Sequence, residues 1–494
     1  MDLNNYRENA QEFLSKLDKE YYLHFSGKKK DLNSEGIHKQ YEWLFSKEYY
    51  DFFYQLKKES RKDNHKNAYL LKFCAEGLVE TDSMQIRDRI AKKETECRVN
   101  IDDKQVPFRY VDVLLANEPS KKKRDLIEEQ RNKKIDSILN DDLYDYWNTL
   151  HQKAKLLGFG NYRDLFAYLK DEDFTATEKN MDVLLEETKD FYEDKFNKVL
   201  VDNIGISLDG ARRSDFAYLK RGKKYDNYFR KQYLIEGFSQ TLYHLGIDIN
   251  RQKNIIFDVG ERENKSPRAF CCTVRIPQEI YLVVMPSGGQ DDYEAVFHEG
   301  GHAEHFAHTR PSLDFEYKFL GDNAVTEGYA FCLENLLNDM EWLVNFIGMD
   351  NETARNFKHF SNMLKLWYCR RYAGKLKYEL ILHDGKPIDG KEEKYREILS
   401  SVGLMDYPKE SYLKDVDEGF YCTNYIRAWI FEAQLKNYIK RKFGGKWFLK
   451  KEAGNFLKEL WSYGQKFDAE NMIKQLGYKG LDIGYLIDSL MEGN

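Results

Sequence analysis

Apolar residues recur at three- and four-residue spacing along most of the first half of the chain, as in residues 41–57 and 178–200. This spacing predicts amphipathic helices. Proline breaks helix interiors, and only Pro107 and Pro119 occur before residue 267, so this half can form long helices. Helical spacing returns after about residue 290. The pattern therefore predicts a mostly α fold.

The pattern changes between about residues 255 and 286. Two β-rich runs, at 269–276 and 280–285, flank a short break, which predicts a hairpin or one small sheet. A helix should follow directly, with Asp291 as its N-cap residue and Glu294 as the capping-box partner. This helix should end before Pro311, because a proline disfavours helix in the residue ahead of it.

Composition and charge narrow the kinds of protein that fit this pattern. The chain has 494 residues, of which 42% are hydrophobic and 15% aromatic, so it can bury a sizeable core. A net charge of −6 argues against partners such as nucleic acid or an anionic membrane surface. No signal peptide or membrane-spanning run is visible, and the seven cysteines are scattered without a CxxC pair. We expect a cytoplasmic protein, and the sequence leaves its oligomeric state open.

The helix expected beside the small sheet contains His298-Glu299-Gly300-Gly301-His302. Histidines four residues apart project from one face of a helix, which is the geometry of two nitrogen ligands to one Zn²⁺ ion. Glu299 lies beside the first histidine, where it can act as general base on an activated water without binding the metal. The two glycines would let another segment approach closely. The alternative is a surface helix that carries two histidines and no metal.

A third ligand would define the class of metal site. His308 would need a glycine turn at position 305, where the chain has His305, and on a continuous helix His308 rotates away from His302. Residues 325–335 form an amphipathic stretch downstream, in which Glu327 would complete a His₂Glu set that leaves a fourth position for water. Glu334, two turns later on the same face, is the second choice. We interpret His305 as a packed residue or one that supports the ligands.

These residues resemble the thimet oligopeptidase and oligoendopeptidase F family of helical zinc peptidases, and more distantly angiotensin-converting enzyme. Residues 296–303 and 327–335 are similar to the family's zinc helix and third-ligand helix. The segment 258–270, with Asp258, Arg262 and Lys265, resembles the strand that precedes the zinc helix. Residues 419–425 resemble an aromatic motif near the C-terminus.

The resemblance implies a two-lobed helical body with a deep central channel that admits short peptides. One zinc ion would lie on the channel floor, held by His298, His302 and Glu327, since the family pattern favours Glu327 over Glu334. We divide the chain into an N-terminal helical part, residues 1–250, and a catalytic part with the small sheet, the zinc helix and the C-terminal helices, residues 251–494. The two parts are expected to form one continuous peptidase unit.

The resemblance also implies roles for residues outside the metal site. Ala269 and Phe270 belong to a strand that pairs with the substrate backbone in the family. Tyr421 and Tyr425 fall where the family places tyrosines facing the zinc, and a phenol there could donate to the oxyanion. Arg427 could hold a substrate carboxylate.

The sequence departs from the family at one functional position. Relatives carry a histidine shortly before the aromatic motif, where it helps to bind the oxyanion, and residues 414–418 contain none. The leading hypothesis is zinc-dependent hydrolysis of peptide bonds in short peptides, with Glu299 as the general base. A carboxypeptidase or dipeptidyl carboxypeptidase on the same scaffold is an alternative. An inactive zinc-binding helical protein is a third hypothesis, favoured by the missing histidine and disfavoured by the intact Glu299.

Overall fold

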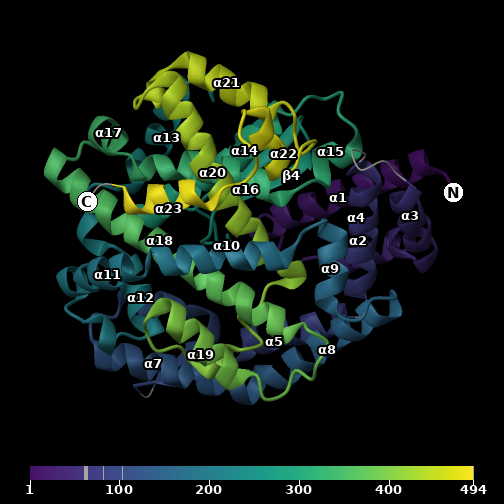
Figure 1. Cartoon of the computed structure of the whole chain (residues 1–494), viewed down its shortest axis with the longest axis horizontal. Coiled ribbons are helices and arrows are strands. Elements are labelled where there is room, and N and C mark those ends of the chain that lie inside the picture. The colour runs from purple at the N-terminus through teal and green to yellow at the C-terminus, as the bar shows by residue number, and fades with distance from the viewer. Residues whose placement is uncertain (60–64, 82, 103, 493–494) are drawn as a thin grey trace. The chain divides into compact units, whose positions relative to one another are not determined.

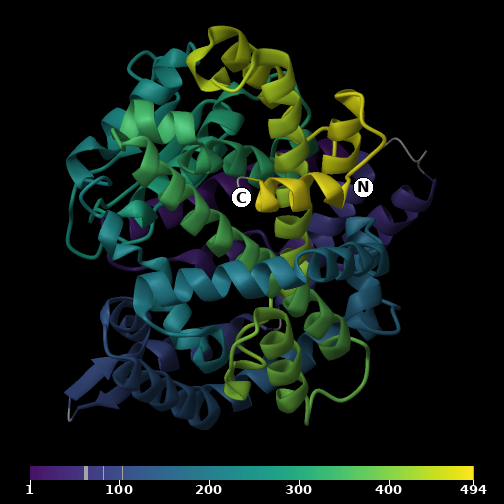
Figure 2. The same cartoon turned by 60° about the vertical axis from the view of Figure 1, so that its left-hand side comes forward.

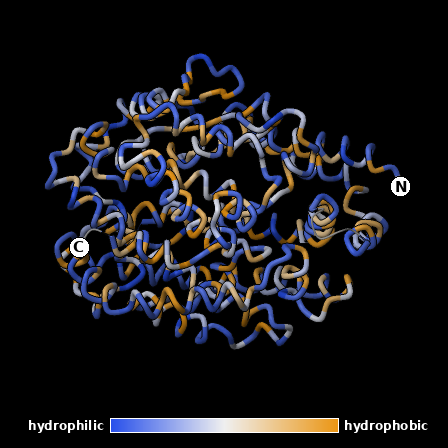
Figure 3. Tube along the Cα trace, turned by 45° about the horizontal axis from the view of Figure 1, so that its top comes forward, coloured by the Kyte–Doolittle hydropathy of each residue, from blue (hydrophilic) through white to orange (hydrophobic). Residues whose placement is uncertain are grey.

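The computed structural model of the chain describes residues 1–59, 65–81, 83–102 and 104–492. Helices make up most of it (Figure 1), and hydrophilic and hydrophobic residues alternate along their traces (Figure 3). The prediction of a mostly α fold is confirmed for the described residues. None of their helices combines the length and the apolarity that a membrane crossing requires.

The chain forms two compact units, each built from separate stretches of the sequence. Unit 1 contains residues 1–74, 223–359 and 427–489, and unit 2 contains residues 75–222, 360–426 and 490–494. Four of the described helices include residues of both units: α4 (His65–Thr81), α18 (Asn351–Leu382), α20 (Tyr421–Phe443) and α23 (Ile483–Met491). The other α-helices of unit 1 are α1 (Leu3–Phe25), α2 (Ser34–Gln40), α3 (Lys47–Glu59), α13 (Leu234–His244), α14 (Gln290–His308), α15 (Phe315–Phe319), α16 (Asn323–Glu334), α17 (Met340–Trp342), α21 (Lys451–Trp461) and α22 (Ala469–Gln475). Those of unit 2 are α5 (Met84–Glu96), α6 (Val111–Asn117), α7 (Lys121–Lys134), α8 (Asn140–Leu156), α9 (Tyr162–Lys170), α10 (Phe174–Glu187), α11 (Lys189–Ile204), α12 (Arg213–Lys220) and α19 (Glu392–Gly403).

A three-stranded sheet in unit 1 has the strand order β3-β5-β4. Strand β4 (Phe270–Arg275) pairs antiparallel with β5 (Glu279–Val283), which confirms the predicted hairpin. Strand β3 (Ile255–Asp258) pairs parallel with the other side of β5. The central strand β5 is buried along nearly all its length, as expected for a strand covered on both faces. Strand β4 is therefore an edge strand of this sheet.

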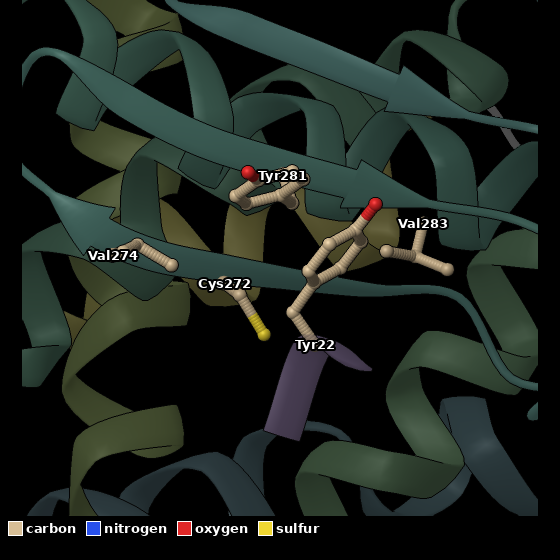
Figure 4. Close-up of a cluster of buried hydrophobic side chains, with 5 residues drawn as sticks. All are labelled: Tyr22, Cys272, Val274, Tyr281 and Val283. Carbon is tan, nitrogen blue, oxygen red and sulfur yellow. The ribbon is translucent and has the colours of Figure 1, made fainter. Parts of the chain in front are cut away.

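Helix α1 packs on this sheet through Tyr22, whose ring stacks on Tyr281 with 3.7 Å between centroids. Figure 4 shows Tyr22 reaching from α1 toward the sheet, beside Val283 of β5 and Cys272 and Val274 of β4. All five side chains are buried. Full burial of an apolar side chain of valine size or larger contributes about 1.5–3 kcal/mol, so this cluster fixes the sheet against α1.

The loop after β3 is tied to the sheet by the buried Lys265. Its ammonium donates to Asp258 Oδ1 at 2.9 Å and to three backbone carbonyls. Arg262 donates to the same carboxylate at 2.5 Å and to the carbonyl of Ser26, just after α1. Burial raises the pKa of Asp258, but the hydrogen bonds from Arg262 and Lys265 outweigh burial and lower it. Asp258, Arg262 and Lys265 thus join α1 to the sheet.

Unit 2 contains a two-stranded sheet that the sequence pattern did not predict. Strand β1 (Arg98–Ile101) pairs antiparallel with β2 (Lys104–Pro107), visible in Figure 2 as two dark blue arrows. Only Val99 and Ile101 of β1 are buried, and β2 is half-buried or exposed. An alternation of two apolar residues is too short to indicate a strand from sequence.

Candidate metal centre

Helix α14 carries the two histidines, and its N-cap residue is Gly289, with no side-chain hydrogen bond. The prediction of Asp291 as the N-cap residue, with Glu294 in a capping box, is therefore wrong, because the helix already begins at Gln290. The helix ends before Pro311, as predicted.

The turn from β5 into α14 is held by Asp292. Its Oδ2 accepts the N–H of Ser287 at 2.6 Å and the N–H of Gly288 at 2.5 Å. Gly288 and Gly289 have φ angles of 96° and 101°, which glycine adopts without steric cost. Two glycines and one carboxylate thus let the chain pass abruptly from the sheet into the helix.

The two glycines inside α14 permit close contacts with neighbouring helices, as the sequence suggested. A Cβ on Gly301 would lie 2.6 Å from the Cα of Ala330 in α16, closer than real Cβ atoms approach another atom. A Cβ on Gly300 would lie 2.3 Å from the ring of Phe238 in α13. The first contact sets α16 directly against α14 and brings Glu327 to the histidines.

His298, His302 and Glu327 form a cluster that we call the histidine cluster. The Nε2 atoms of His298 and His302 lie 3.4 Å and 3.6 Å from Oε2 of Glu327. Ligand atoms held tetrahedrally about 2.0–2.1 Å from zinc lie about 3.4 Å apart. The side chains are only 18%, 13% and 7% exposed. The donor types and their spacing are therefore compatible with a tetrahedral zinc ion held by these three residues.

The second nitrogen of each imidazole is held by a residue of α16. His298 Nδ1 lies 2.8 Å from Oε2 of Glu334, and His302 Nδ1 lies 2.8 Å from Oγ1 of Thr326. Acceptors at Nδ1 fix the ring orientation and leave Nε2 to bind a metal. Glu334, the second-choice ligand, thus lies behind His298. Neither supporting role is predicted by the sequence pattern, although both residues lie on the same helix as Glu327.

The charges in the histidine cluster favour a cation. Burial raises the pKa of Glu327, but hydrogen bonds from His298 and His302 outweigh burial and hold it well below its usual range. Burial lowers the pKa of His298, and contacts with Glu327 and Glu334 reverse this effect and raise it. Two carboxylates therefore stabilise positive charge at His298, and a bound divalent ion would supply positive charge at the same place.

Glu299 lies beside the cluster and faces the edge strand. Burial raises the pKa of Glu299, and the opposing effects of His302, His298 and a hydrogen bond from the N–H of Cys271 only partly offset this rise. A carboxylate whose pKa is raised toward neutrality is a better proton acceptor at physiological pH. The contact with Cys271 places the end of β4 next to this carboxylate.

Arg427 positions the helix that carries Glu327. Its guanidinium forms a two-pronged ion pair with Asp322, at 3.0 Å and 2.7 Å. Asp322 is the N-cap residue of α16 and also accepts the N–H of Ala469 at 3.0 Å. Burial raises the pKa of Asp322, but the charge of Arg427 and the backbone N–H groups of Ala469 and Ala324 outweigh burial and lower this pKa to about 2. The role of Arg427 in holding a substrate carboxylate stays a prediction.

The other predicted site residues fall in two places. Phe270 is the first residue of β4, and Ala269 directly precedes the strand. Tyr421 and Tyr425 lie in the first turns of α20, within unit 2, with ring centroids 5.3 Å apart. The assigned roles of these four residues in substrate and oxyanion binding stay predictions.

The remaining histidines of α14 are packing residues. His308 Nδ1 donates to the carbonyl of Glu304 at 2.9 Å, and His305 Nε2 donates to the carbonyl of Gly464 at 3.2 Å. Burial lowers the pKa of His305 to about 3, so this ring is neutral. Neither residue belongs to the histidine cluster, as the helical geometry predicted for His308.

Unit 2 contains a second group of possible ligands, which we call the acid–thiol cluster: Glu379, Asp417 and Cys422. Glu379 accepts the N–H of Asp417 at 2.8 Å and the thiol of Cys422 at 3.1 Å. Lys375 lies 2.7 Å from Asp417 Oδ1. A lysine ammonium already supplies the positive charge in this cluster. Its bonds fix the turn that precedes the aromatic motif at residues 419–425.

A comparison with models of known protein families gives no match, and no curated protein matches the chain.

Proposed function

We propose that the protein is a zinc-dependent peptidase that hydrolyses peptide bonds in short peptides. The observation that carries this proposal is the histidine cluster with Glu299 beside it, next to the edge strand β4. The resemblance of the zinc-helix and third-ligand segments to the thimet oligopeptidase and oligoendopeptidase F family supports it. The two-lobed body with a deep channel, which the resemblance implies, belongs to the same proposal and would exclude folded proteins.

The side chains have distinct roles in this reaction. Held by His298, His302 and Glu327, Zn²⁺ would polarise the scissile carbonyl and lower the pKa of a water molecule. Glu299 accepts the proton from the attacking water and then delivers it to the leaving amine. Glu334 holds the ring of His298 so that Nε2 keeps its direction.

Substrate and oxyanion would be held by groups outside the cluster. Strand β4 is an edge strand, and an extended peptide can add to such an edge through main-chain hydrogen bonds. Ala269 and Phe270 lie where this pairing would begin. Tyr421 or Tyr425 would donate to the oxyanion in place of the histidine that the family carries.

A carboxypeptidase or dipeptidyl carboxypeptidase is the second candidate. It needs a cation that grips the C-terminal carboxylate of the substrate. Arg427, the predicted cation, forms a two-pronged ion pair with Asp322, and a substrate carboxylate would have to compete with Asp322 for it. This observation favours internal cleavage.

The test is to incubate the full chain with unstructured peptides of graded length, with and without a zinc chelator, and to identify the products by mass spectrometry. We expect chelator-sensitive internal cuts, whereas stepwise C-terminal losses would favour the second candidate. Glu299→Gln should keep its zinc and lose about 10²–10⁴-fold in kcat, the range typical of a removed general base. Glu8→Gln, which neutralises an exposed glutamate of α1, is the matched control and should be fully active. A fully active Glu299→Gln enzyme would show that another group is the base.

A further inference from the structure

Asp18, on helix α1, binds the edge of strand β4. Its Oδ2 accepts both the backbone N–H and the hydroxyl of Thr273, each at 2.9 Å. A backbone N–H at a free sheet edge is a group with which an added strand would pair. Asp18 occupies this donor, as Glu299 occupies the N–H of Cys271, so a peptide aligned on β4 could pair with Thr273 only by displacing the Asp18 carboxylate.

Two carboxylates thus face the same edge of β4. The N–H of Cys271 interacts with Glu299, and the N–H of Thr273 binds Asp18. The register of β4 against β5 shifts between Cys272 and Arg275, yet both N–H groups bind carboxylates outside the sheet, and residues two apart in an extended chain lie about 7 Å apart. An extended peptide whose scissile bond lies beside Glu299 would therefore place a group about two residues away from that bond next to Asp18.

Asp18 has no cationic partner among the described residues, and the two cations nearest to it and to Thr273 along the chain, Lys19 and Arg275, have another partner. Lys19, the next residue on α1, pairs with Glu279 at 2.8 Å. Arg275, at the end of β4, pairs with the same carboxylate of Glu279 at 2.8 Å. Both cations therefore form ion pairs with Glu279 of β5. The hydrogen-bond donors to Asp18 are the neutral N–H and hydroxyl of Thr273.

A carboxylate in this setting gains from a positive ligand. The burial of Asp18 raises its pKa, and the two hydrogen bonds from Thr273 only partly offset this rise. A buried carboxylate that is hydrogen-bonded but not paired retains part of its desolvation cost. A cation from a bound peptide would remove that cost, whereas an anion at the same place would be repelled.

We propose that Asp18 is a specificity-determining residue that selects peptides with a positive charge about two residues from the scissile bond. The charge is a free α-amino group or a lysine or arginine side chain. A C-terminal carboxylate or an acidic side chain is disfavoured there. This inference rests on the proposed peptidase function, since it assumes that a peptide lies along β4.

The test separates binding from cleavage by using the zinc-loaded Glu299→Gln chain. Calorimetry would measure the affinity of matched peptides that carry Lys, Gln or Glu at each position, with a free or an acetylated N-terminus. We expect the best Lys or free-amine peptide to bind about tenfold more tightly than its Gln or acetylated counterpart, equivalent to about 1.4 kcal/mol. Adding Asp18→Asn should abolish this preference while leaving the affinity of the neutral peptide within about twofold.

The control variants distinguish charge recognition from a change in structure. Asparagine still offers an oxygen to Thr273, and Asp18→Glu should restore a preference for the cation. Glu8→Gln removes one negative charge from the same helix about 15 Å away and should leave the preference intact. A charge preference that survives Asp18→Asn, or a chain that binds none of the peptides, would overturn the inference. If the unchanged chain, which keeps Glu299, binds cationic peptides selectively but does not hydrolyse them, the role of Asp18 is supported and the proposed reaction is overturned.

Discussion

Among the described residues, each unit contains one group of three buried or half-buried side chains whose possible ligand atoms lie within 4.8 Å of one another. In the histidine cluster of unit 1, one carboxylate faces two imidazole nitrogens whose other nitrogens are held from behind. In the acid–thiol cluster of unit 2, two carboxylates and a thiol lie around Lys375. Both clusters meet the same limit of spacing, but only the acid–thiol cluster has a lysine ammonium beside its carboxylates.

Ligand spacing alone therefore does not indicate a metal site. A lysine ammonium is always a donor and repels a metal ion, whereas a neutral imidazole offers a lone pair once its second nitrogen is hydrogen-bonded. The charge of the acid–thiol cluster is therefore balanced by Lys375 without a metal ion. Its hydrogen bonds hold the turn before the aromatic motif. The histidine cluster gains most from a divalent cation.

The largest expected difference between the clusters is in metal affinity. Glu327→Gln should weaken zinc binding by about a thousandfold or more, equivalent to about 4 kcal/mol, because it removes one ligand and its negative charge. Glu379→Gln makes the same chemical change in the acid–thiol cluster and should leave zinc affinity unaltered. Zinc titration against a competing chelator measures both. Equal losses in the two variants would remove the distinction drawn between the clusters.

A smaller effect on the same affinity is expected from the residue behind His298. Glu334→Gln keeps the shape of the side chain but weakens the acceptor at Nδ1, and losses of about 10–100-fold in metal affinity are typical of such partners. The same chelator competition applies, with Glu8→Gln as the control for lost charge. If Glu334→Gln binds zinc as loosely as Glu327→Gln, then Glu334 is a ligand and not a support.

The close approach of α14 and α16 gives a third test, on stability. Gly301→Ala would press a methyl group onto the backbone of Ala330, and overpacking of this kind costs about 1–3 kcal/mol. Gly445→Ala is the control, because nothing lies within 4 Å of its added Cβ. Urea unfolding of the metal-free chains measures both free energies. A Gly301→Ala chain as stable as Gly445→Ala would show that the helices can separate without cost.

The smallest expected effect is a change in the pH dependence of unfolding. Burial, and then the charge of Asp417, raise the pKa of Glu379 to about 8 from an ordinary value of 4.5. Its contribution to stability is therefore fully present below pH 4.5 and is lost as the pH rises through about 8. Glu379→Gln removes this loss, because glutamine resembles the protonated acid.

The stability of Glu379→Gln relative to the unchanged chain should thus rise between pH 5 and pH 8, a window taken from the same pKa shift. Chemical unfolding at a series of pH values measures the difference, in which the other titrating groups largely cancel. A constant difference across this window would mean that Glu379 is ionised throughout, as a metal ligand would be.

Much of the candidate site could be predicted because its signals are local. The four-residue spacing of His298 and His302, and the two β-rich runs before them, depend on periods that a single segment displays. Glu334 and Thr326 could not be assigned, because their contacts with the histidines depend on how α16 packs against Gly301. The binding of Asp18 to Thr273 joins residues 255 positions apart. No pattern along the chain marks contacts of that kind.

The most direct test of the account is a titration of the metal-free full chain with zinc, with the rate of peptide hydrolysis measured after each addition. We predict a rate that rises in proportion to added zinc and stops rising at one zinc ion per chain, because the three residues of the histidine cluster form one site. A rate that does not depend on zinc, or that keeps rising well beyond one ion per chain, would contradict the assignment of this cluster as the catalytic metal site.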